Sequence, residues 1–248
     1  MAATSGRGFW ILDDLGLLQT MTANQSSFKL FKPKDTYRIF GGSANNFIPG
    51  LGQNPKSGVT LDYYLGKDID SLELKLEVLE DSKVIRTYSS KKDKDFKSWP
   101  GGPSAPQVLP AKKGYNRFTW DFQRESLPGV DNVFVHGDHS GSNVAPGNYT
   151  LRLSLENEGG SETEVTILPN PNVESTPSDF KEQQTALSRI ENTIRDIHES
   201  VNNMRSAKSQ LEGYAKLLKD NDAAKELLDK GKTLIERITT WEENLIQP

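Results

Sequence analysis

The most restrictive feature of the sequence is its last part, which almost completely lacks turn-forming residues. Beyond Pro177 the next proline is Pro248, and the only glycines are Gly213 and Gly231. Apolar residues recur there every three or four positions, the spacing of a helix face that packs against another helix. They form two rows, the first made of Leu187, Ile190, Ile194, Ile197, Val201, Met204 and Leu211, and the second of Ala224, Leu227, Gly231, Leu234, Ile238, Trp241 and Leu245.

Two helices with one apolar row each predict a long antiparallel hairpin over residues 172–248. Pro177 and Asp179 are residue types typical of a helix N-terminus, and the polar residues 220–222 separate the two rows. Two courses stay open for the first helix, which either runs on through Gly213 or breaks there and folds back. If it runs on, the apolar face is wider than a hairpin covers, and we expect the tail to self-associate.

Residues 57–171 have the opposite character, with short β-branched and aromatic runs separated by turns. The runs lie at residues 58–65, 72–78, 84–88, 116–122, 149–155 and 163–168. Short strands in series without intervening helices predict an immunoglobulin- or fibronectin III-like antiparallel β-sandwich. The fold class is therefore mixed β and α in separate domains. The chain has no cysteine, which excludes the inter-sheet disulfide of antibody domains.

Alternation within the strands predicts which residues form the sandwich core. Phe118, Trp120 and Phe122 fall on one face of their strand, and we expect Trp120 to be buried between the sheets. Two longer polar segments, Lys91–Pro110 and Arg124–Val144, interrupt the strands. Because they are too polar for a core, they are predicted to be surface loops at the ends of the sandwich.

The charge and hydropathy patterns exclude several classes of function. The net charge is −4, without the basic excess that holds a nucleic acid backbone, so no nucleic acid partner is expected. No apolar run approaches the ~18 residues of a membrane span, and the first residues lack the pattern of a signal peptide. No phosphate-binding glycine loop follows a predicted strand, and no cofactor is expected.

Four motifs, in order along the chain, carry a resemblance to a known family. They are Ser5–Leu15 (SGRGFWILDDL), Leu30–Arg38 (LFKPKDTYR), Gly114–Asp121 (GYNRFTWD) and Ala145–Leu151 (APGNYTL). Together they resemble the C-terminal region of bacterial sortilin-like BNR-repeat β-propeller proteins, which are often labelled glycosyl hydrolases. The resemblance covers essentially the whole chain, but the Asp-box of the propeller blades, Ser-x-Asp-x-Gly-x-Thr-Trp, does not occur in it.

The resemblance implies a domain order and a location. Residues 1–27 would be the remnant of the last propeller blade, with Gly6–Leu12 as its closing strand, and residues 28–56 an extended connector. The sandwich and the helical hairpin would follow, and the chain would be truncated at both ends. The family further implies a periplasmic or secreted protein.

One loop has residue types that bind metal ions. His136, Asp138 and His139 offer two imidazoles and a carboxylate within four positions, and a folded loop can bring such groups around one ion. The alternative is a solvated polar loop, since no fourth ligand is indicated. His198 lies on the polar side of the first helical row and is expected to be a surface residue.

Aromatic residues are the candidates for ligand binding. Trp99, Tyr88 and Tyr115 lie in or beside predicted loops, where exposed rings can stack on sugar faces. Tyr64, like Phe118 and Trp120, is expected in the inter-sheet core instead. The acidic residues Asp13, Asp14 and Asp121 lack the paired spacing that glycoside hydrolysis needs, and capping or turn roles are expected for them.

These observations favour a non-catalytic accessory region of a larger exported propeller protein. It would support the propeller and mediate assembly through the helical hairpin. The alternative is a carbohydrate-binding module attached to a glycosidase-type propeller, with Trp99 and residues 136–139 at the sugar. Whether the complete parent protein is an enzyme stays open.

Overall fold

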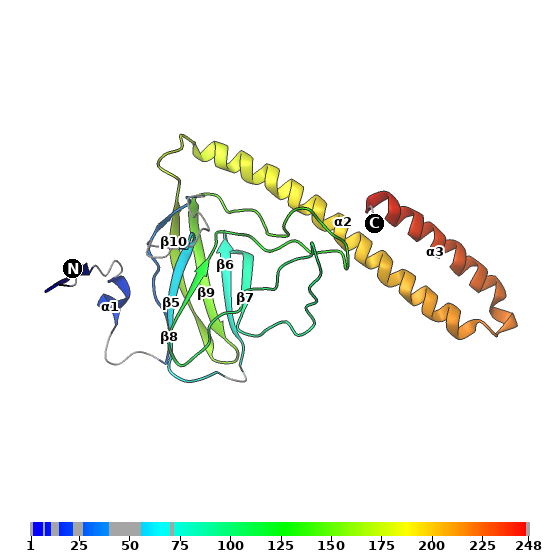
Figure 1. The fold of residues 1–248 in the computed structure, drawn as a ribbon, viewed down its shortest axis with the longest axis horizontal. Coiled ribbons are helices and arrows are strands. Elements are labelled where there is room, and N and C mark those ends of the chain that lie inside the picture. The colour runs from blue at the N-terminus through cyan, green and yellow to red at the C-terminus, as the bar shows by residue number, and fades with distance from the viewer. Residues whose placement is uncertain are drawn as a thin grey trace. The chain divides into compact units, whose positions relative to one another are not determined.

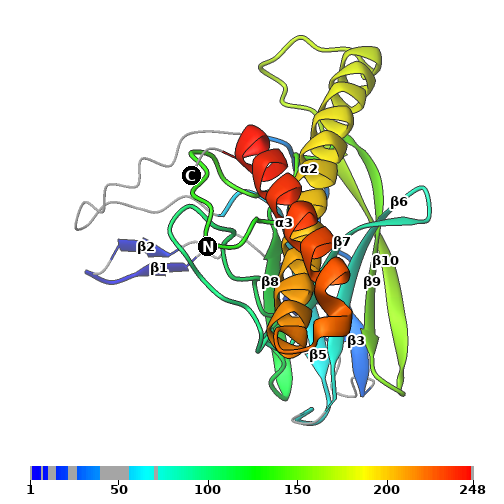
Figure 2. The same cartoon turned by 90° about the vertical axis from the view of Figure 1, so that its right-hand side faces the viewer.

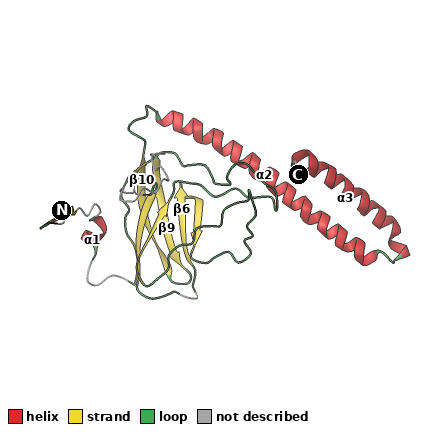
Figure 3. Ribbon diagram, viewed as in Figure 1, coloured by secondary structure: helices red, strands yellow, loops and turns green. Residues whose placement is uncertain are grey.

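A computed structural model describes residues 2–6, 8–10, 15–21, 27–39, 56–69 and 72–246. The protein has mixed β and α content, and its two long helices come after the strands (Figures 1 and 3). Its residues divide into two compact units, and the division does not follow the expected boundary at residue 172. The β-unit comprises residues 1–93, 106–122 and 144–180, and the helical unit comprises residues 94–105, 123–143 and 181–248.

Two sheets form the body of the β-unit. The five-stranded sheet has the order β4-β10-β9-β6-β7, with β4 at Thr36–Tyr37, β10 at Gly159–Leu168, β9 at Gly147–Leu155, β6 at Leu74–Glu80 and β7 at Lys83–Ser89. The three-stranded sheet has the order β3-β5-β8, with β3 at Phe28–Leu30, β5 at Val59–Leu65 and β8 at Gly114–Trp120. All six strand runs expected from the sequence therefore correspond to strands of these sheets.

Residues 28–56 are not only a connector, as the sequence suggested. β3 pairs antiparallel with β5, while β4 pairs parallel with β10, in the register Ile167 to Thr36. The chain thus passes from one sheet to the other within a few residues, and the strands are mixed rather than all antiparallel. Both strands are two or three residues long, too short for periodicity to reveal them.

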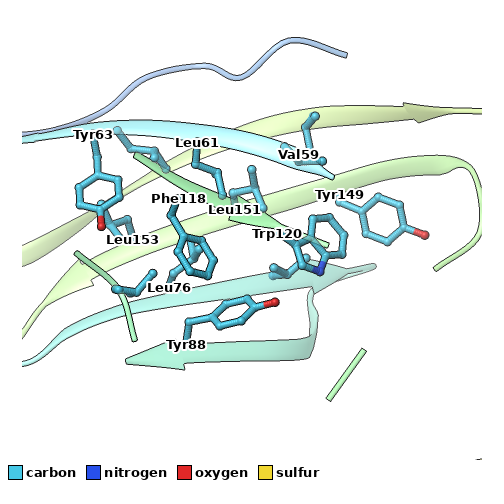
Figure 4. Packing of buried hydrophobic residues seen from close by; sticks show 14 of the residues in the cluster. Val59, Leu61, Tyr63, Leu76, Tyr88, Phe118, Trp120, Tyr149, Leu151 and Leu153 are labelled. Atoms are coloured by element: carbon cyan, nitrogen blue, oxygen red, sulfur yellow. The ribbon is translucent and has the colours of Figure 1, made fainter. Parts of the chain in front are cut away.

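Side chains from both sheets meet in one hydrophobic cluster (Figure 4). Trp120 lies at its centre with no exposed surface, as predicted. Its ring is edge-on to Tyr149, with the ring centroids 5.6 Å apart. Leu61 and Leu151 enter the cluster from opposite sheets. The period-2 pattern therefore identified the buried face of β8 correctly.

The first residues are described in part. β1 (Ala2–Thr4) pairs antiparallel with β2 (Gly8–Trp10), and α1 spans Gly16–Thr20. The end of the expected closing strand, residues 11–12, and the Asp13-Asp14 pair lie outside the described residues.

Two long helices follow the sheets. α2 spans Pro177–Leu218 and α3 spans Lys225–Leu245, joined by a short 3-10 turn, η1, at Asp222–Ala224. α2 starts with a capping box: the Asp179 carboxylate accepts from the backbone N–H of Thr176 at 2.7 Å, while the Asp179 N–H donates to the Thr176 hydroxyl. α2 runs unbroken through Gly213, which settles the question of its course. At ~1.5 Å per residue it is about 63 Å long.

α3 lies beside the C-terminal half of α2 (Figures 1 and 2). Polar contacts hold the pair in register, since Arg205 donates to Glu242 at 2.7 Å and Lys208 donates to Thr239 at 2.8 Å. The hairpin expected from the sequence is therefore present.

The predicted packing row of α3 is wrong at alternate positions. Leu228 and Ile235 are half-buried, whereas Leu227 and Leu234 are 63% and 44% exposed. Each buried residue sits directly beside its exposed neighbour in sequence. With apolar residues adjacent at both places, the period alone cannot decide which one faces the other helix. An apolar row therefore stays on the outer face of α3.

Candidate functional site

The candidate site residues of the helical unit lie in two segments inserted between strands, residues 94–105 and 123–143, here called the inserted loops. Trp99 fixes the first loop to the second, because its indole Nε1–H donates to the Val133 carbonyl at 2.9 Å. The ring is half-buried and lies against Gly102 and Gly129, where a Cβ would collide with it. Trp99 thus holds the two inserted loops together.

The second inserted loop, residues 123–143, also binds side chains of α2. Asn202 donates to the Gly129 carbonyl at 2.8 Å, Arg205 donates to the Asp131 carbonyl, and Glu191 accepts from the Ser142 N–H. The second loop is therefore packed on α2 within the helical unit. The first of these segments is mostly exposed, as expected of a surface loop. The contacts of the second with α2 were not predicted, because composition cannot distinguish a backbone solvated by water from one bound to polar side chains.

His139 and His198 lie close together at this contact. His139 is buried, and its Nε2 is 3.1 Å from the Gly101 carbonyl oxygen. His198 is half-buried rather than on the surface, and its Nδ1 is 2.6 Å from the Pro128 carbonyl oxygen. The centroids of the two rings are 5.9 Å apart.

A carbonyl oxygen only accepts hydrogen bonds, so each ring nitrogen that faces one must carry the proton. His139 therefore donates through Nε2 and His198 through Nδ1. Both histidines serve here to hold the backbone of the inserted loops.

The three predicted metal ligands do not converge. The His136 ring is edge-on to Phe134 at 4.9 Å, Asp138 accepts from the Ser140 N–H at 2.9 Å, and His139 faces Gly101. Among the residues for which the structure gives a placement, no three histidine, cysteine, aspartate or glutamate side chains are arranged to hold a metal ion.

The α2 side chains that carry these contacts were not among the predicted site residues. Glu191, His198, Asn202 and Arg205 are spaced by seven, four and three residues, which places them on one helix face. A polar stripe of this kind on a helix that also has an apolar row is the signal that could have identified them.

Tyr88 does not fit its predicted role in ligand binding. It is buried in the core of the β-unit, where its ring packs edge-on against Phe118 at 4.7 Å and its hydroxyl lies 3.4 Å from Asp121. Burial raises the pKa of the Tyr88 phenol well above its usual range, although Arg86 opposes that shift. A sugar cannot reach this ring, because the alternation of β7 turns it inward.

Tyr115 has the exposed position that a ligand-binding residue requires. It lies on β8 and is 40% exposed, on the face of the three-stranded sheet that points away from the core. Its ring packs edge-on against Tyr64, with the centroids 5.1 Å apart. Tyr64, expected in the core, lies on this outer face because its neighbour Tyr63 takes the inward position.

Comparison of the chain with models of known protein families and with curated proteins gives no match. Within the part of the chain that is described, no helix is both long and apolar enough to cross a membrane. Function must therefore be inferred from the geometry.

Proposed function

We propose that this protein is a non-catalytic accessory region, made of an immunoglobulin-type sandwich and a helical hairpin, of a larger exported propeller protein. Two features support the sandwich type: two facing sheets with one core, and a hydrogen bond from the Tyr149 hydroxyl to the Ala145 carbonyl at 2.7 Å. The last resembles the tyrosine corner of immunoglobulin-type domains.

The accessory role is inferred from the hydrogen bonds that hold the inserted loops. Loops between strands of such sandwiches commonly bear the binding or catalytic groups. Here Trp99, His139 and His198 are turned toward backbone carbonyls within the helical unit. Side chains held in this way stabilise the contacts of the inserted loops with each other and with α2 instead of meeting a substrate.

The helical hairpin is the element proposed for assembly. α3 presents Leu227 and Leu234 on its outer face, and further exposed apolar residues lie on α2, among them Leu217. Apolar rows exposed along a helix pair mark interaction surfaces. The rest of the propeller chain is the partner proposed from the family resemblance, and a second copy of this chain is the partner accessible to direct test.

An activity assay tests the non-catalytic role. The purified chain, incubated with aryl glycosides and sialosides, is expected to release no more product than the buffer blank. Reproducible turnover that is lost in Asp121→Asn would overturn the proposal. Asp121 is chosen because, of the acidic residues Asp13, Asp14 and Asp121, it is the one that lies within the described residues. The proposed parent protein is tested separately by sequencing the reading frame upstream of Met1, which is expected to encode Asp-box blades. Unrelated sequence there would reject the propeller assignment.

A further inference from the structure

The outer face of the three-stranded sheet carries three cross-strand pairs in a row. In the register of β5 with β8, Thr60 lies opposite Thr119, Asp62 opposite Arg117 and Tyr64 opposite Tyr115. The residues between them on β5, such as Leu61 and Tyr63, point into the core. Since side chains alternate along a strand, all three pairs share the outer face.

One end of this row is an ordered aromatic surface. The Tyr115 ring contacts Tyr64 edge-on and lies 6.1 Å from the ring of Phe31, which is buried. The Lys29 ammonium lies 4.8 Å from the centroid of the Phe31 ring. Tyr115 is thus supported on two sides while a large part of its surface stays exposed, so little conformational entropy remains to be lost on binding.

The middle of the row is charged but internally balanced. Arg117 donates to both carboxylate oxygens of Asp62, from Nε at 2.7 Å and from Nη2 at 2.9 Å. About half of the Arg117 side chain (54%) is exposed, whereas Asp62 is mostly covered. A planar pair of this kind offers polar edges to a ligand without a net charge.

The other end of the row opens into a hollow of about 770 Å³. Its walls include the Thr60 and Thr119 hydroxyls, which lie 3.5 Å apart, together with Gln107 and Asp121. The row and the hollow adjoin, because Arg117 lines both. Along the strand, Tyr115 and Thr119 are four residues apart, about 14 Å at ~3.4 Å per residue.

We propose that this face, from Tyr115 to the hollow beside Thr119, binds a neutral oligosaccharide. The apolar face of a sugar ring stacks on an exposed tyrosine, and sugar hydroxyls pair with carboxylate, guanidinium and hydroxyl groups. The balanced Asp62–Arg117 pair gives no preference for an anionic chain. This site goes beyond the accessory role proposed above and does not depend on it.

Affinity gel electrophoresis of the full chain tests the proposal, with hydroxyethylcellulose, glucomannan, xylan and laminarin as probes. We expect retardation by at least one polysaccharide, and at least a tenfold weaker affinity for Tyr115→Ala. Tyr115→Phe keeps the stacking ring and is expected to bind within about twofold of the wild type. Tyr214→Ala is the matched control, because Tyr214 is an exposed tyrosine on α2, in the helical unit.

Thermal unfolding of each variant separates loss of binding from loss of fold. The proposal is overturned if the wild type migrates unretarded in all four polysaccharides. It is also overturned if a folded Tyr115→Ala variant binds as tightly as Tyr214→Ala. If Tyr115→Ala does not fold, the same comparison is made with Arg117→Met, whose expected effect is again at least tenfold.

Discussion

Removing the indole of Trp99 should loosen the helical unit while leaving the β-unit intact. Trp99→Phe keeps an aromatic ring against Gly102 and Gly129 but removes the N–H that donates to Val133. Trp99→Ala removes the ring as well. The pair of variants therefore separates the hydrogen bond from the packing.

The expected magnitudes follow from the position of the ring. Loss of one hydrogen bond to a half-buried carbonyl costs about 1 kcal/mol. A fully buried tryptophan costs ~3–5 kcal/mol when truncated to alanine, and the half-buried Trp99 should lie at the low end, about 3 kcal/mol. Trp99 holds the second inserted loop, which contacts α2 through Gly129 and Asp131, so the loss should extend to α2 near Asn202.

Hydrogen exchange measures the effect residue by residue, because it reports local opening free energies. Amides in residues 127–135 and 198–205 should exchange about fivefold faster in Trp99→Phe and about a hundredfold faster in Trp99→Ala. Phe134→Ala, a change at an exposed residue of the second inserted loop, is the control and should have little effect. Unchanged exchange in both Trp99 variants, or equal acceleration in β5 and β9, would refute the role assigned to Trp99.

Three further predictions concern assembly, pH and the sandwich. Leu227→Glu combined with Leu234→Glu should weaken self-association by about 4 kcal/mol, at ~2 kcal/mol per fully buried leucine; sedimentation of a wild-type monomer independent of concentration would refute it. Hydrogen bonds from the backbone and side chain of Thr176 hold the pKa of Asp179 below its usual range. The resulting stabilisation is therefore present above the unfolded-state pKa and is lost as the pH falls through the folded-state pKa. In an NMR carboxyl titration, Thr176→Val should raise this pKa part of the way back, and an unchanged midpoint would contradict the capping box. Tyr149→Phe should lower the free energy of unfolding by about 1–2 kcal/mol in urea titrations, and no loss would count against the tyrosine corner.

The sequence predicted the parts of the fold that rest on periodicity. The alternation around Trp120 identified a buried face because one side of each sheet meets the core. The recurrence of apolar residues every three or four positions predicted the hairpin. It did not identify the packing row of α3, because Leu227 and Leu228 are equally apolar. The short strands β3 and β4 escaped notice because two or three residues carry no measurable period.

The candidate sites were harder to predict, because each depends on contacts between distant segments. Trp99 and His139 form hydrogen bonds to backbone carbonyls. Every residue has a backbone carbonyl, so the sequence does not indicate which one accepts a given hydrogen bond. Tyr88 and Tyr115 both looked accessible, and only the direction of each side chain on its strand distinguishes them. Tyr115 was identified by residue type, whereas its partners Tyr64 and Arg117 required the strand register.

The division of the chain between the two units limits how its gene can recombine and the order in which the units can fold during synthesis. Six segments alternate between the units, so the chain changes unit five times. Neither unit is therefore encoded by one continuous stretch of the gene that recombination can move or delete as a whole. On the ribosome, the inserted loops emerge before α2, the helix whose side chains bind their backbone. Completion of the helical unit must await translation of residues 181–248, after the strands that flank those loops have been made.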